Sequence, residues 1–180
     1  MDTTKLGMLI CMYTGIRLGE VCALKWEDIS LDAGTLAIKR TIQRIRNNNQ
    51  KTDNKTVIIF DAPKSQSSIR SIPLPSFMLE IMKNFETTKN CFVLTGDSQA
   101  YIEPRTLQYR FKNILQQAGI DDINFHAVRH TFATKCVNLG FDIKTLSEIL
   151  GHSDVSVTLN TYVHPSISVM KSYMERLNNV

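Results

Sequence analysis

The sequence predicts an α+β fold that is mainly α-helical and carries a small three-stranded antiparallel sheet. Two observations predict it. Apolar residues recur at helical spacing near the N-terminus and again from about residue 76 onward, whereas residues 31–74 are rich in β-favouring residues separated by turn signals. The chain has 180 residues, 43% of them hydrophobic and 21% charged, which is enough for one domain with a buried core. Composition therefore excludes disordered, collagen-like and low-complexity chains.

The first two helices are predicted on either side of Gly15. Residues 3–13 carry apolar side chains at helical spacing, and a second helix is expected over about 17–26. In that second helix Arg17 and Glu20 lie three positions apart, so they are expected to share one side.

After the second predicted helix, the spacing of apolar residues changes from that of a helix to that of strands. The run LDAGTLAIKRTIQRI has a turn signal at 32–34 followed by β-favouring residues, and further strands are predicted at 55–60 and 68–74. The polar segments 47–54 and 61–68 read as loops between them. Three antiparallel strands are the simplest interpretation.

The rest of the chain is predicted to be helical, over about 76–86, 104–118, 125–140, 142–151, 153–163 and 166–178. Gly140 and Gly151 stand where the glycine after a helix is expected, and Ser153 or Asp154 can cap the next helix. No internal repeat or second domain is visible, so residues 1–180 are expected to form a single domain.

The lack of a recognisable targeting signal, together with the cysteine usage, predicts a cytoplasmic protein. The longest uninterrupted apolar stretch, residues 8–13, is far below the roughly 20 residues needed to span a bilayer. The N-terminus lacks the basic region and cleavage site of a signal peptide. The cysteines form no CxxC pair and sit among apolar neighbours, which favours reduced core residues: Cys11, Cys22, Cys91 and Cys136.

Positive charge is concentrated in one segment. Residues 39–70 hold eight Lys and Arg against two Asp, a net +6, whereas the whole chain carries +4, so the remainder sums to −2. A basic segment on a slightly acidic body suits a polyanion such as DNA. A solvated hairpin with exposed lysines is the simpler alternative, and composition alone favours it.

A few polar residues could do chemistry. His126 and Arg129 lie three apart on one predicted helix and can act on one ligand group, although a partly buried histidine beside an exposed arginine would look the same. With His130, His126 could also begin a zinc site, but no acidic residue or cysteine pair completes a ligand set. His152 follows a helix end and could be a simple turn residue. Tyr162 falls at the spacing of an apolar stripe, so core packing is its default interpretation.

Four stretches together resemble the tyrosine recombinases, the phage-integrase family: TGIRLGEVCALKWEDI at 14–29, APKSQSSIRSIPL at 62–74, HAVRHTFAT at 126–134 and LGHSDVSVTLNTYVH at 150–164. They occur in the family's order and cover nearly the whole chain. The resemblance implies six catalytic residues: Arg17, Lys64, His126, Arg129, His152 and the nucleophile Tyr162. Glu20 matches the acidic residue that accompanies the first arginine. The chain would then be the catalytic domain alone, without the core-binding and arm-binding domains that precede it in longer members.

The resemblance also implies a reaction. Tyr162 would attack a DNA phosphate to give a 3′-phosphotyrosyl link and a free 5′-hydroxyl. Arg17, Arg129 and His152 would stabilise the charge on phosphorus, Lys64 would protonate the leaving oxygen, and His126 would act as an acid or base. No metal, nucleotide or other cofactor is implied. The expected partners are double-stranded DNA at a specific site, further copies in a synaptic tetramer, and directionality or accessory proteins, with no membrane. An isolated domain could be monomeric, and the protein would associate with the bacterial nucleoid when acting.

Three other interpretations stay open at this point. A type IB topoisomerase would use a similar constellation to reseal the same strand, and a non-catalytic DNA-binding module would use only the basic hairpin and a helix. A metal-dependent nuclease is disfavoured, because clustered acidic residues are scarce. A mobile-element integrase, of phage or conjugative-transposon type, is the preferred interpretation.

Overall fold

The computed structural model describes residues 2–47, 55–61, 69–85, 88–163 and 167–179. The α-helices are α1 (Thr3–Thr14), α2 (Leu18–Ala23), α3 (Ser76–Lys83), α4 (Pro104–Gln117), α5 (His126–Asn138), α6 (Ile143–Leu150), α7 (Val155–Tyr162) and α8 (Ile167–Glu175). The strands are β1 (Ile29–Ser30), β2 (Thr35–Ile38), β3 (Thr41–Arg46), β4 (Thr56–Asp61) and β5 (Arg70–Pro73). Short 3-10 helices lie at Trp26–Asp28 and Arg176–Asn179.

Local signals set the helix ends. The Asp2 carboxylate accepts from the Lys5 N–H at the start of α1, and Gly15 ends that helix with a φ of 63°, a left-handed conformation that suits glycine. Asp142 and Asp154 cap α6 and α7 in the same way, and Gly151 ends α6 with a φ of 67°. The predicted cap of α7 is therefore Asp154.

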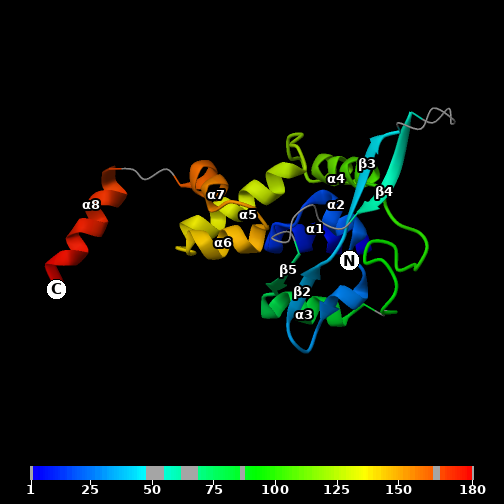
Figure 1. Cartoon of the computed structure of the whole chain (residues 1–180), viewed down its shortest axis with the longest axis horizontal. Helices are drawn as coiled ribbons and strands as arrows, with labels where there is room; N and C mark the ends of the chain where they lie inside the picture. The colour runs from blue at the N-terminus through cyan, green and yellow to red at the C-terminus, as the bar shows by residue number, and fades with distance from the viewer. Residues whose placement is uncertain (1, 48–54, 62–68, 86–87, 164–166, 180) are drawn as a thin grey trace.

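The small sheet is confirmed, but its membership differs from the prediction. The three-stranded sheet has the order β1-β2-β5, and β3 and β4 form a separate antiparallel ladder (Figure 1). The run expected as one strand breaks at residues 39–40. Lys39 and Arg40 turn there to form ion pairs with the buried carboxylate of Asp28, and the chain leaves one sheet for the other.

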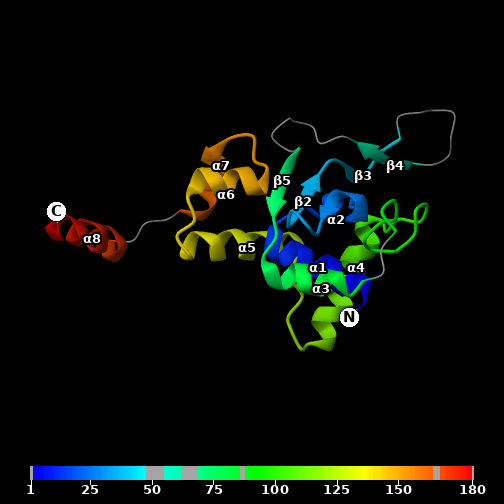
Figure 2. The same ribbon diagram turned by 90° about the horizontal axis from the view of Figure 1, so that it is seen from below.

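One apolar core joins the first helices, the sheet and α3 to α5. Figure 2 shows one end of α5 meeting α1, with α6 beside β5. Leu6, Ile10, Leu36, Met78 and Leu107 are fully buried in this core. A smaller cluster between α5 and α6 contains Ala133, Cys136, Leu146 and Leu150.

Two other expectations can be checked in the structure. All four cysteines are free and buried, as predicted. The apolar stripe expected on α7 is wrong: Val155 and Leu159 are 39% and 45% exposed, whereas Thr158 is fully buried. The helix therefore packs through Thr158 and Tyr162, four positions apart, rather than through Val155 and Leu159. No helix among the described residues is long and apolar enough to cross a membrane.

Candidate active site

Arg17 stands immediately before α2 and reaches toward the end of α6. Its backbone N–H donates to Glu20 Oε2 at 2.8 Å, and its Nη1 lies 3.0 Å from Glu20 Oε1. Its Nη2 donates to the carbonyl of Gly151 at 2.9 Å. The side chain is 39% exposed, so the guanidinium is fixed on one side and open to solvent on the other.

The buried carboxylate of Glu20 holds a second arginine, Arg70 on β5. Arg70 donates to both Glu20 oxygens, at 3.1 and 2.9 Å, and through Nε to the carbonyl of Ile149 at 2.6 Å. Burial opposes ionisation of Glu20, but hydrogen bonds and charge from Arg70 and Arg17 outweigh it and lower the pKa of Glu20. Arg70 thus ties α2, β5 and the end of α6 together.

Arg129 lies on α5 and is only 4% exposed. Its Nη1 donates to the Gly15 carbonyl at 2.6 Å, and its Nη2 donates to the Leu150 carbonyl at 2.9 Å and lies 2.8 Å from Nε2 of His152. Burial and the charge of Arg17 lower the pKa of Arg129 to about 10, so the guanidinium stays charged at neutral pH. Backbone carbonyls at two helix ends thereby fix its position.

His152 follows Gly151 and faces Arg129. Because a guanidinium can only donate, Nε2 of His152 accepts from Arg129, and Nδ1 carries the proton beside Oγ1 of Thr158 at 2.7 Å. Burial, reinforced by the charges of Arg129, Arg17 and Arg70, lowers the pKa of His152 to about 4. The imidazole is therefore neutral at pH 7, and it can donate to a phosphate only after its proton moves to Nε2.

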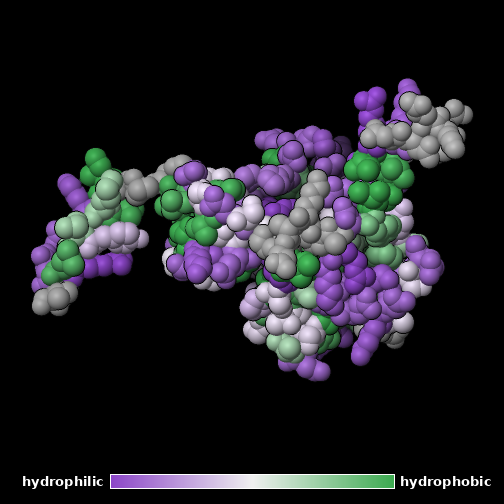
Figure 3. All heavy atoms as spheres, in the orientation of Figure 1, coloured by the Kyte–Doolittle hydropathy of each residue, from purple (hydrophilic) through white to green (hydrophobic). Residues whose placement is uncertain are grey.

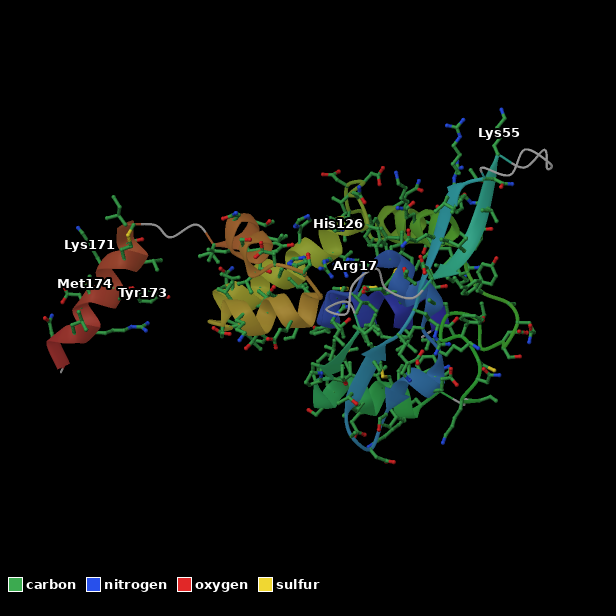
Figure 4. All side chains as sticks on the ribbon, in the orientation of Figure 1. Arg17, Lys55, His126, Lys171, Tyr173 and Met174 are labelled. Carbon is green, nitrogen blue, oxygen red and sulfur yellow. The ribbon has the colours of Figure 1, made fainter. Side chains whose placement is uncertain are left out.

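His126 begins α5 and lines a small cavity. The cavity has a volume of about 180 Å³, and Arg17, His126 and Arg129 contribute to its lining. Figure 4 shows Arg17 and His126 close together between α2 and α5. Burial and the charges of His130, Arg129 and Arg17 lower the pKa of His126. Two guanidinium groups around a cavity of this size can hold a phosphate group.

Tyr162, the last residue of α7, is half-buried against the small cluster between α5 and α6. Its hydroxyl lies 2.9 Å from Nδ1 of His130, and the two rings are 5.5 Å apart. The ring of His126 meets that of His130 edge to face at 4.6 Å. Burial raises the pKa of Tyr162, and the charge of Arg129 opposes that rise.

The basic segment is partly neutralised by the fold. Lys39, Arg40, Arg44 and Arg70 form ion pairs with Asp28, Glu27, Glu103 and Glu20. Lys55 projects at the far end of the β3-β4 ladder, with hydrophobic surface on the ladder below (Figures 3 and 4). Lys64 lies outside the described residues. Among the described residues of the segment, these four cations are thus already paired with carboxylates.

The structure brings five of the six predicted site residues to the packed ends of α1, α5, α6 and α7: Arg17, His126, Arg129, His152 and Tyr162. Sequence reasoning gave no role to Arg70 or Thr158 and saw His130 only as a zinc ligand. A signal for His130 was present, since it lies one turn after His126 on the same face of one helix. In the described part of the chain, no group of three His, Cys, Asp or Glu side chains could hold a metal ion.

The sequence matches a known family over most of its length. The model of the phage integrase family matches residues 2–168. The chain belongs to the phage integrase family. The resemblance seen in the four motifs is therefore confirmed, and so is the fold class.

Relatives within the phage integrase family include tyrosine recombinases and transposon transposases. A XerC-like tyrosine recombinase of Caldanaerobacter subterraneus is 32% identical over 96% of this chain and 48% of its own length. The transposase of Tn916 from Enterococcus faecalis is 24% identical over 95% of this chain and 44% of its own length. The chain thus spans about half the length of the curated relatives it matches.

Solved structures give the same fold. The Tn1549 transposon integrase in complex with a circular intermediate DNA superposes with a TM-score of 0.73 at 25% identity, covering 96% of this chain and 58% of that one. The XerA recombinase superposes with a TM-score of 0.65 at 21% identity, covering 97% of this chain and 57% of that one.

Proposed function

We propose that the chain is the catalytic domain of a site-specific DNA recombinase that integrates or excises a mobile element. One observation carries the proposal: Arg17, Arg129 and His152 meet at the end of α6, and Tyr162 ends the next helix. The similarity to the Tn916 transposase and to the Tn1549 transposon integrase supports the part of the proposal that concerns a mobile element. Domains outside this chain would supply the remaining DNA contacts in the whole protein.

Each residue has a role that its surroundings allow. The Tyr162 oxygen attacks phosphorus, the bond from phosphorus to the 5′ oxygen breaks, and the electron pair leaves with that oxygen, which becomes a 5′-hydroxyl. Arg17, which is open to solvent, and Arg129, which is rigidly held, stabilise the charge on the phosphate oxygens. His126 lines the same cavity. Lys64, matched by the family motif, would protonate the leaving oxygen.

Covalent capture tests the proposal. The chain, joined to its upstream region, is incubated in EDTA with nicked duplexes tiled across the DNA that flanks its own gene. We expect a protein–DNA adduct that survives denaturation, forms without metal, and disappears in Tyr162→Phe while DNA binding persists. An adduct that persists in Tyr162→Phe would show that another residue is the nucleophile. No adduct from any flanking duplex would favour a binding module.

The last helix supports the expectation that the chain assembles with further copies of itself. Figure 1 shows α8 set apart from the body, and its apolar side chains are exposed by 40–71%: Ile167, Val169, Met170, Tyr173 and Met174. A groove of about 500 Å³ between α1, α4 and α5 is lined mainly by apolar residues, including Met8, Met12, Phe111 and Phe132. A second copy of the chain, placing its α8 in this groove, would cover both surfaces.

Analytical ultracentrifugation tests whether α8 of a second copy occupies the groove. Self-association should increase with concentration and be lost both in Met170→Asp, on α8, and in Met12→Arg, in the groove. Leu139→Arg is the matched control, because Leu139 is 67% exposed but lies outside the groove. A compact monomer that Met170→Asp makes more extended would instead indicate that α8 covers its own groove.

A further inference from the structure

The hydroxyl of Tyr162 is paired with a histidine that the family motifs did not place in the site. Nδ1 of His130, on α5, lies 2.9 Å from the hydroxyl oxygen. His126, to which the resemblance gave the acid or base role, lies one turn earlier, with its ring 4.6 Å from that of His130. Of the two histidines, His130 is therefore the one within hydrogen-bond reach of the reacting oxygen in the described structure.

The phenol needs a proton acceptor at this point. Burial raises the pKa of Tyr162, so the hydroxyl is protonated at neutral pH and is a weak nucleophile. A general base must lie within about 2.6–3.2 Å of the proton donor, and the separation of Nδ1 from the hydroxyl satisfies that condition. The charged groups near the pair are the guanidinium of Arg129 and, when protonated, the imidazole of His126. The positive charge of Arg129 favours the phenolate that forms.

We propose that His130 is the general base that takes the proton of Tyr162 during attack on DNA. This inference rests on the proposed function. As the bond from the tyrosine oxygen to phosphorus forms, the phenolic proton moves to Nδ1 and leaves His130 as an imidazolium. In the reverse step the departing phenolate takes the same proton back. For Nδ1 to accept, the resting imidazole must carry its proton on Nε2.

The tautomer can be measured without DNA. Long-range ¹H–¹⁵N NMR at neutral pH on the ¹⁵N-histidine-labelled chain assigns the proton-bearing nitrogen of His130, with His130→Gln identifying the signal. We expect the Nε2–H tautomer, and a shift of the Nδ1 resonance in Tyr162→Phe, where the hydroxyl is lost. A proton resident on Nδ1 in the unmodified chain would overturn the proposal, because that nitrogen could then only donate.

Kinetics test the proton transfer itself. A general base contributes about 100-fold or more, so His130→Ala should slow formation of the covalent adduct by about 100-fold. A fluorinated tyrosine at position 162 ionises more readily and needs the base less. In that background we expect the loss caused by His130→Ala to shrink to about 10-fold or less.

His126→Ala is the matched control, because His126 is on the same helix face but does not contact the hydroxyl. The fall in the rate of adduct formation caused by His126→Ala should be the same with tyrosine and with fluorinated tyrosine at position 162. If His130→Ala costs the same with both tyrosines, His130 only positions the ring, and if it costs nothing, the base is elsewhere. Absence of any adduct from the unmodified protein would instead contradict the proposed function.

Discussion

At the scale of single residues, the site is organised by one buried carboxylate. Glu20 is 3% exposed and accepts hydrogen bonds from both Arg17 and Arg70. An ion pair at this depth contributes little net stability but is costly to break, because the remaining charge is left buried. Glu20 therefore fixes the direction in which Arg17 presents its free side.

The Glu20→Gln substitution tests this arrangement. It leaves the guanidinium of Arg70, which is 7% exposed, without its counter-charge, so we expect a loss of about 3 kcal/mol in the free energy of unfolding. The pKa of Glu20 is lowered in the folded state, so its contribution to stability is present above its ordinary value of 4.5 and is lost as the pH falls below it. Urea unfolding across that range should show a shallower acid decline in Glu20→Gln. An equally steep decline would contradict the inference.

His152 predicts a second decline of stability with falling pH, which begins at a higher pH than the decline caused by Glu20. Its pKa is about 4 in the folded chain against an ordinary 6.5, so protons bind preferentially to the unfolded chain between these values. Stability from this group is present above pH 6.5 and declines as the pH falls toward 4. Between about pH 7 and pH 5, His152→Asn should reduce the loss of unfolding free energy by about 1 kcal/mol, allowing for solvent screening. NMR titration of the imidazole gives the pKa directly.

At the scale of elements, the ends of helices hold the two site arginines in place. The carbonyls of Gly15, Leu150 and Gly151 accept from the two site arginines. These are the carbonyls that an α-helix leaves without an intrahelical partner at its C-terminus. The ends of α1 and α6 therefore position Arg129 and Arg17 through unused backbone groups.

Replacing Gly15 should damage both the helix end and the site. Its φ of 63° disfavours any side chain, and an added Cβ would overlap the ring of Phe132. Gly140→Ala is the matched control, since Gly140 also has a positive φ, of 80°, but no atom within 4 Å of the added Cβ. We expect about 1 kcal/mol of destabilisation in Gly140→Ala and at least about 2 kcal/mol more in Gly15→Ala, measured by chemical denaturation. Equal losses would mean that Phe132 moves aside freely.

Most helices could be predicted from the sequence, because capping residues, glycines and apolar periodicity are local signals. The strand partners could not. In the described part of the chain β4 pairs with β3, outside the three-stranded sheet, and the preceding run divides where Lys39 and Arg40 form ion pairs with Asp28. The site residues came from motif resemblance, whereas the His130–Tyr162 contact depends on how α7 packs on α5, which no spacing encodes.

At the scale of the whole molecule, α8 is independent of the body. Its apolar side chains are exposed, and its contacts in the described structure are chiefly with the short helix that follows it. Deleting residues 167–180 should therefore change the free energy of unfolding by less than about 0.5 kcal/mol. Thermal unfolding of the dilute chain checks this expectation. A large loss would show that α8 packs on its own domain in solution.

The contacts that hold the two site arginines also have a consequence during synthesis. Arg17 bonds a carbonyl 134 positions later, and Arg129 bonds one 114 positions earlier. Ribosomes add about 5–20 residues per second, so the early motif waits several seconds for its partners. A nascent or prematurely terminated chain that has not yet reached residue 151 therefore lacks the contacts that hold both site arginines.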